Sequence, residues 1–183
     1  MSFVEFLIQK KNVLFTSACL IVAYTIIWRL RKALPASVSM IMMLFSLDLA
    51  FSLDNTLGLP PFDFYNTNII PSFNGPDALT LLLYPAFGFL FTYFYYRFRI
   101  SGVAITGYIL LWAVLGVCFE ALNVQFDVFQ YKGWRLTYSF YIYLLVQTLM
   151  VLMYNFIRET FVRAKSTTNM RSKSQWHAGS KRY

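Results

Sequence analysis

Long runs of apolar residues, separated by short polar and basic stretches, dominate this chain. A helix needs about 20 mostly apolar residues to cross the hydrocarbon core of a bilayer, because lipid offers its backbone no other hydrogen-bond partners. Several runs meet this requirement. They predict helices over about residues 12–28, 36–53, 77–96, 101–121 and 136–157. The predicted fold class is therefore all-α, a polytopic transmembrane bundle of about five helices.

Prolines refine this pattern. Pro35 suits the first turn of the second predicted span, whereas Pro85 lies inside the third and is expected to kink it. The loop at 54–76 contains four prolines and two glycines, which argues against regular structure over its length. Two interpretations of this loop remain open. It folds back over the helix ends, or it forms a lid over a cavity.

Composition supports a membrane protein of a single domain. Of the 183 residues, 58% are hydrophobic and only 13% are charged, which lies outside the range of soluble domains. The net charge of +8 would suit nucleic acid only if the basic residues shared one folded face. Here they collect at the ends of the apolar runs. We therefore predict the lipid bilayer as the main partner and no nucleic acid.

The basic residues also predict an orientation. Most of the 16 lysines and arginines lie in the loops after the first and third spans and in the segment after the fifth. Loops rich in lysine and arginine stay in the cytoplasm. The N-terminus is thus expected outside and the C-terminus in the cytoplasm, with the chain in the plasma membrane.

Residues 158–183 are expected to behave differently from the transmembrane domain of residues 1–157. They are basic and poor in apolar side chains, so we predict a disordered cytoplasmic tail. Such a tail is attracted to anionic lipids by about 1 kcal/mol for each basic residue near the surface. His177, the single histidine, lies in this tail and is expected to be solvated.

Two acids inside the spans are the first candidates for function, because ionisable groups are costly in hydrocarbon. They are Asp48 and Glu120. Asp48 lies about 120° around the helix from Asp54, so these two do not form a pair on one face. Asp48 either shares a proton with Glu120 across helices or forms a structural ion pair with Arg135 or Lys132. Glu120, at a helix end, also fits an interfacial residue.

Polar residues recur on one face of two spans, and we expect both faces to point into the bundle. Helix packing explains them without any ligand. The fifth span carries Ser139, Tyr143, Gln147 and Tyr154, and the third carries Thr80, Tyr84, Gly88 and Thr92.

Signatures of catalysis and of metal binding are missing from the sequence. The predicted spans contain no histidine, lysine or arginine, and the chain has no Cys-x-x-Cys and no phosphate-binding glycine loop. Cys19 and Cys118 fall within apolar runs and are expected to be free thiols. We therefore predict no catalytic residue, no metal and no cofactor.

One segment carries a pattern of a glutamate ending a span, a Tyr-x-x-Trp, and then a serine and a tyrosine opening the next span. Here these are Glu120, Tyr131, Trp134, Ser139 and Tyr143. The pattern resembles an uncharacterised family of small multi-spanning membrane proteins of spore-forming Gram-positive bacteria, over roughly residues 36–157. The resemblance implies a membrane location and no particular activity.

In physical terms this segment predicts a cluster at one membrane surface. Tyr131 and Trp134 suit the headgroup level, and Glu120 is placed to pair with Arg135 or to accept hydrogen bonds from Tyr131 or Ser139. The cluster is a binding site or a clasp between the last two spans.

Three function classes follow, in order of preference. The first is a non-enzymatic scaffold, sensor or subunit of a membrane assembly, with a membrane protein as partner. The second is a small-solute transporter or lipid-binding protein, with an outer-facing cavity near Asp48 and Glu120 lined by the two polar faces. The third is a membrane enzyme. A cavity with access to water would favour the second class over the first.

Overall fold

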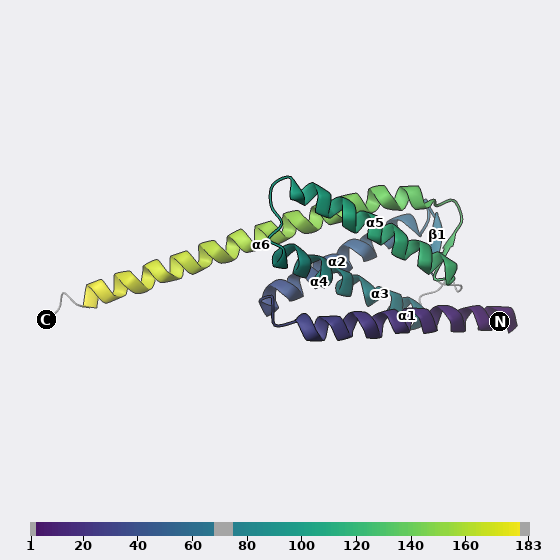
Figure 1. The fold of residues 1–183 in the computed structure, drawn as a ribbon, viewed down its shortest axis with the longest axis horizontal. Coiled ribbons are helices and arrows are strands. Elements are labelled where there is room, and N and C mark those ends of the chain that lie inside the picture. The colour runs from purple at the N-terminus through teal and green to yellow at the C-terminus, as the bar shows by residue number, and fades with distance from the viewer. Residues whose placement is uncertain (1–2, 68–74, 180–183) are drawn as a thin grey trace.

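The computed structural model describes the backbone of residues 3–67 and 75–179, and the side chains of residues 10–66 and 77–160. Helices make up almost all of it (Figure 1). The elements in chain order are α1 (Phe3–Leu30), α2 (Ala36–Leu57), β1 (Tyr65–Thr67), α3 (Gly75–Leu81), α4 (Leu83–Arg97), α5 (Ala104–Gln125), β2 (Phe129–Tyr131) and α6 (Leu136–Gly179).

The described residues contain 5 helical stretches that are long and apolar enough to cross a membrane. This confirms the predicted number of helices that could serve as spans, and it is compatible with an integral membrane protein that has several of them. The observed stretches extend a few residues beyond most of the predicted ends, because the helices continue into the polar flanks. They are Lys10–Leu30, Ala36–Leu57, Asp77–Arg97, Ala104–Gln125 and Leu136–Thr160.

The helices form a bundle in which α4 packs against α1, α2 and α6, and α5 packs against α6 (Figure 1). The main core joins α2, α4, α5 and α6 through Met42, Phe91, Tyr108 and Met150. Many large apolar side chains point outward from the bundle, as expected where lipid replaces water.

The third span is broken close to Pro85, as its sequence predicts. Helix α3 ends at Leu81 and α4 begins at Leu83. Pro85 has no N–H to donate to the carbonyl four residues earlier, and its ring crowds that carbonyl, which belongs to Leu81. The carbonyl oxygen of Leu82, at the break, accepts a hydrogen bond of 3.1 Å from the hydroxyl of Tyr24 in α1. The break therefore also ties α4 to α1.

A short antiparallel ladder joins β1 to β2, with Tyr65 opposite Tyr131 and Thr67 opposite Phe129. We call the end of the bundle that carries it the sheet end. The carbonyl oxygen of Phe64 accepts hydrogen bonds from the backbone of the segment that follows β2. The predicted lack of regular structure in the loop at 54–76 is therefore wrong at this point: the described part of the loop folds back and pairs as a strand.

The tail also differs from its prediction. Helix α6 continues to Gly179 and leaves the bundle as a single projecting helix (Figure 1), where we expected disorder after residue 157. No proline or glycine occurs between Leu136 and Gly179, and extending an existing helix costs little per residue. The side chains beyond residue 160, including His177, lie outside the described residues.

Candidate functional site

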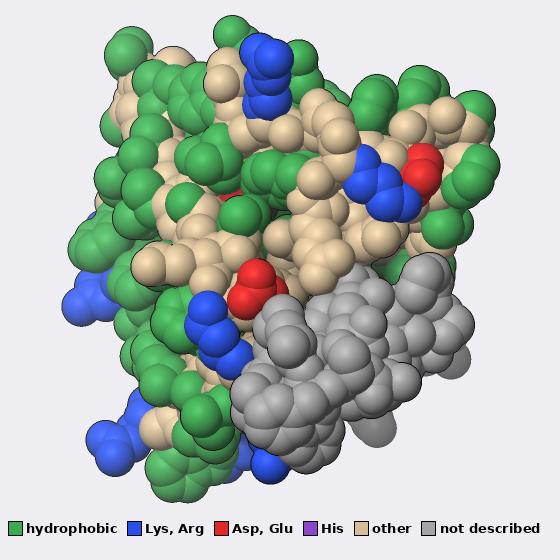
Figure 2. Space-filling model, turned by 90° about the vertical axis from the view of Figure 1, so that its right-hand side faces the viewer, with side chains coloured by type: hydrophobic (Ala, Val, Ile, Leu, Met, Phe, Trp, Pro, Cys, Tyr) green, Lys and Arg blue, Asp and Glu red, His purple; other side chains and the backbone are tan. Residues whose placement is uncertain are grey.

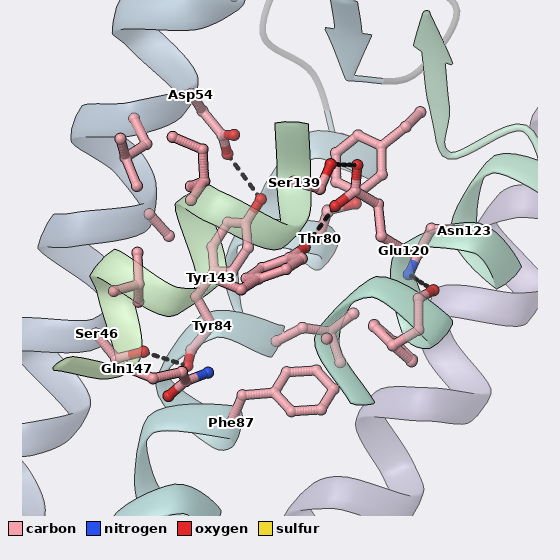
Figure 3. A pocket seen from close by; sticks show the side chains of 18 of the residues that line it. Ser46, Asp54, Thr80, Tyr84, Phe87, Glu120, Asn123, Ser139, Tyr143 and Gln147 are labelled. Atoms are coloured by element: carbon pink, nitrogen blue, oxygen red, sulfur yellow. Dashed lines mark hydrogen bonds between the residues drawn. The ribbon is translucent and has the colours of Figure 1, made fainter. Parts of the chain in front are cut away.

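A cavity of about 200 Å³ lies between the spans, beginning at the sheet end. Its walls come mainly from α2, α4, α5 and α6 (Figure 3). Tyr65 of β1 and Tyr131 of β2 also line it. It reaches as far along α6 as Met150, about 21 Å from the start of that helix by helical rise. The cavity therefore extends from the sheet end deep into the bundle.

Glu120 lies in the cavity wall at the end of α5 and is only 7% exposed. Its carboxylate accepts hydrogen bonds from the hydroxyls of Ser139 at 2.6 Å and Tyr143 at 2.7 Å (Figure 3). The hydroxyl of Tyr131 donates a third. The Ser139 oxygen in turn accepts the indole N–H of Trp134 at 2.7 Å. The hydrogen bonds predicted from Tyr131 and Ser139 are confirmed. Glu120 is buried among donors rather than interfacial.

Local geometry brings these donors together. Ser139 and Tyr143 lie four residues apart on α6, so both side chains leave the same face of the helix. The ring of Tyr143 rests on Gly116 of α5, where an added Cβ would lie 3.1 Å from the ring. Gly116 precedes Glu120 by one helical turn. The missing side chain thus lets the tyrosine cross α5 closely enough to reach the carboxylate.

Asp54 is the second carboxylate of the cavity. It lies in the last turn of α2 and accepts a hydrogen bond of 2.7 Å from the hydroxyl of Tyr84 (Figure 3). It also accepts one of 2.7 Å from the hydroxyl of Tyr65. We assigned Asp54 to the external loop, because the second span was expected to end at residue 53. The helix continues to Leu57, which places this carboxylate inside the bundle.

Asp48 does not line the cavity, contrary to the predicted arrangement. Its side chain is exposed on the outer surface of α2. The reason is the angle of about 120° between Asp48 and Asp54, since only one of the two faces inward. Neither predicted ion pair of Asp48 forms: Lys132 pairs with Asp63 at 2.6 Å, and the Arg135 side chain is exposed at the sheet end.

The two tyrosines of the ladder are held as neutral donors. Burial raises the pKa of Tyr65 far above its ordinary value, and the negative charge of Asp54 adds to the effect. Burial also raises the pKa of Tyr131, and its hydrogen bond to Glu120 acts in the same direction. Both hydroxyls therefore stay protonated at physiological pH and donate hydrogen bonds to the carboxylates.

The polar faces predicted for two spans point into the bundle. Tyr84 and Gly88 of α4 line the cavity, as do Tyr143 and Gln147 of α6. Tyr154, further along α6, belongs instead to the main core.

The cavity has a polar end and an apolar end. The two carboxylates and their donors lie near the sheet end, whereas Phe91, Trp112, Val146 and Met150 line the deeper part. The described side chains include no group of three or more His, Cys, Asp or Glu residues able to hold a metal ion. The arrangement is suited to binding a small molecule that is polar at one end.

Viewed onto the sheet end, hydrophobic side chains cover much of the surface, and a few acidic and basic side chains lie among them (Figure 2). Lys132 and Asp63 form one ion pair at this end, and Lys11 and Asp127 form another at 3.5 Å. The charges of these four residues are thus balanced in pairs at the sheet end.

Comparisons with protein-family models, with curated proteins and with solved structures found no match for this chain. The assignment of a function therefore depends on the geometry of the cavity.

Proposed function

We propose that this chain is a multi-pass membrane protein that binds a small solute in the cavity at its sheet end, as a transporter or as a receptor. The observation that carries the proposal is the cavity itself. Protein interiors are packed with few voids larger than one water molecule. A volume of about 200 Å³ corresponds to roughly seven water molecules at about 30 Å³ each. In a bundle that served only as a scaffold, side chains would be expected to fill this space.

The acids in the wall support the same conclusion. A carboxylate buried among membrane spans is costly, and such groups commonly mark solute or ion pathways. Here Asp54 and Glu120 are both held in place by tyrosine hydroxyls before any ligand arrives. This preorganisation reduces the cost of ordering the site on binding.

The size of the cavity favours a small solute over a lipid. Pockets for drug-sized ligands span about 300–1,000 Å³, and this cavity is smaller. A site that reaches toward the bilayer centre from one surface is also where secondary transporters hold their substrates. Under the predicted orientation the cavity faces the outside of the cell.

Access to the cavity can be tested by cysteine labelling in a Cys19→Ala, Cys118→Ala background. Val146 lines the cavity, and its neighbour Leu145 is 52% exposed on the lipid-facing surface of the same helix. We expect Val146→Cys to react with iodoacetamide in purified membranes. Leu145→Cys should not, because a thiol in hydrocarbon stays protonated and only the thiolate is reactive.

Equal labelling at the two positions would contradict the proposal, because it would mean that reactivity does not depend on the cavity. An unreactive Val146→Cys would contradict it as well, since water would then not enter the cavity.

A second candidate function is supported by one observation, the outward position of Asp48. Its carboxylate is exposed on α2, about 14 Å from the end of that helix and thus at the depth of the hydrocarbon. Charged side chains at this depth almost always face protein or water rather than lipid. A neighbouring membrane protein, or a second copy of the chain, would cover Asp48. We therefore keep a subunit of a membrane assembly as the alternative.

Purification from native membranes in mild detergent, followed by native mass spectrometry, tests this alternative. A complex should be found for the wild type and should dissociate in Asp48→Asn, with Asp127→Asn as the control at the surface. A wild type that is monomeric and without protein partners would exclude it.

A further inference from the structure

The charge of the cavity wall is one-sided. Among the described residues that line the cavity, Asp54 and Glu120 are acidic and none is a lysine, arginine or histidine. The nearby lysines of the sheet end are engaged elsewhere, Lys132 with Asp63 and Lys11 with Asp127. Two acids thus share the polar end of the cavity without a basic side chain from the wall.

The hydrogen bonds around Glu120 suit the ionised carboxylate. The indole N–H of Trp134 can only donate, so the Ser139 oxygen accepts it and the single Ser139 proton is directed to Glu120. Tyr131 and Tyr143 supply two more hydroxyl donors to the same carboxylate. Because an ionised carboxylate is an acceptor only, all three donors are satisfied when Glu120 is negative.

The remainder of the wall is aromatic and apolar. Aromatic rings attract a cation through their negative faces, and Phe87, Phe119 and Trp134 line the cavity together with the carboxylates. The deeper part offers only apolar contacts, from Phe91 and Met150 among others. A bare metal ion would leave this part unfilled, whereas an organic cation would occupy both ends.

We infer, building on the proposed function, that the solute is a small organic cation, an alkyl or arylalkyl ammonium whose charged end lies at Asp54 and Glu120 and whose hydrocarbon part lies in the deep apolar end. Its size follows from the volume. A cavity of 150 Å³ holds benzene, so about 200 Å³ holds about eight non-hydrogen atoms.

The test uses two compounds of equal shape and different charge, 2-phenylethylamine and 2-phenylethanol. Each is titrated against iodoacetamide labelling of Val146→Cys in the Cys19→Ala, Cys118→Ala background. The amine should protect the thiol at a concentration about tenfold or more below that of the alcohol, because only the amine forms charge-assisted hydrogen bonds. Equal protection by the two compounds would overturn the cation while leaving a solute-binding cavity in place.

Two further outcomes separate this inference from the proposed function. Better protection by benzoate, an anion of matching size, or labelling that neither phenylethyl compound prevents, would also overturn the cation but not the accessible cavity. Failure of Val146→Cys to react at all would overturn the cavity itself and both proposals with it.

Substitutions then assign the charge selectivity to residues. Glu120→Gln and Asp54→Asn should each reduce the preference for the amine over the alcohol to about threefold or less. Protection by the alcohol should remain, which shows that the variant is folded. Asp127→Asn is the matched control, since it removes an acid at the same end of the molecule but outside the cavity. Retained tenfold preference in both cavity variants would overturn the inference.

Discussion

Replacing Gly88 with alanine tests how closely α2 and α4 approach each other. A Cβ added to Gly88 would lie 2.4 Å from the Cβ of Ser46, 2.8 Å from its hydroxyl oxygen and 3.2 Å from the carbonyl oxygen of Met42. Ordinary contacts begin at about 3.4 Å, so the helices must separate locally by about 1 Å or Ser46 must move. Movement of Ser46 would break its 2.9 Å hydrogen bond to the carbonyl oxygen of Tyr84.

The expected loss of stability follows from these contacts. Overpacking of a rigid interface costs about 1–3 kcal/mol, and loss of the Ser46 hydrogen bond costs about 1 kcal/mol. The better helix propensity of alanine returns up to about 1 kcal/mol. We therefore expect Gly88→Ala to lower the free energy of unfolding by about 1–3 kcal/mol. The assay is reversible unfolding in mixtures of dodecyl maltoside and sodium dodecyl sulfate, followed by circular dichroism.

Two further variants make the result specific. Gly107→Ala in α5 meets no atom within 4 Å, so it should be neutral or slightly stabilising. Ser46→Gly removes the atoms that would collide, and the double variant Ser46→Gly, Gly88→Ala should recover about 1 kcal/mol or more relative to additivity. A Gly88→Ala protein as stable as Gly107→Ala, or strictly additive effects in the double variant, would refute the close packing of α2 on α4.

Three other outcomes are expected in the same unfolding assay. Tyr143→Phe should cost about 1.5–3 kcal/mol, since it removes one donor from the buried carboxylate of Glu120; a change below about 0.5 kcal/mol would contradict that hydrogen bond. Because the pKa values of Tyr65 and Tyr131 are raised, the folded chain keeps protons that the unfolded chain releases, so stability should fall as the pH rises above about 10. The double variant Tyr65→Phe, Tyr131→Phe should flatten this decline, and an unchanged slope of stability against pH would refute the explanation. Lys132→Gln should change stability by no more than about 0.5 kcal/mol, because the side chains of Lys132 and of its partner Asp63 are each 44% exposed.

The spans could be predicted from the sequence because run length alone decides whether a segment crosses a bilayer. The break near Pro85 could be predicted for a similar reason, since proline acts on its own helix. Two of the donors to Glu120, Tyr131 and Ser139, could also be predicted from the sequence. They follow Glu120 by 11 and 19 residues, and the short connection between α5 and α6 must bring them back toward it.

The second acid of the cavity was missed because its environment is built from distant parts of the chain. Asp54 meets Tyr65 across a loop and Tyr84 from another span, 30 residues away. The sequence does contain one signal. The helical angle allows only one of Asp48 and Asp54 to face inward, and Tyr84 belongs to the polar face of the third span. Choosing the acid deeper in the predicted span led to the wrong one.

The pairing of β1 with β2 was not predictable from local pattern. Each strand has three residues, too few to show an alternation of apolar and polar side chains, and the partner lies more than 60 residues away. The helical continuation of α6 was not predicted for a different reason. We judged the tail by its lack of burial, whereas propagation from a stable helix requires none.

The ladder between β1 and β2 also links Asp54 to Glu120 mechanically. Tyr65 and Tyr131 face each other in its register, and one is bonded to Asp54 and the other to Glu120. A ligand that moved either tyrosine away from its acid would also distort the pairing of β1 with β2, and this would displace the opposite tyrosine. A ligand at either acid would thereby act on the loop at 54–76 through the same strand pair.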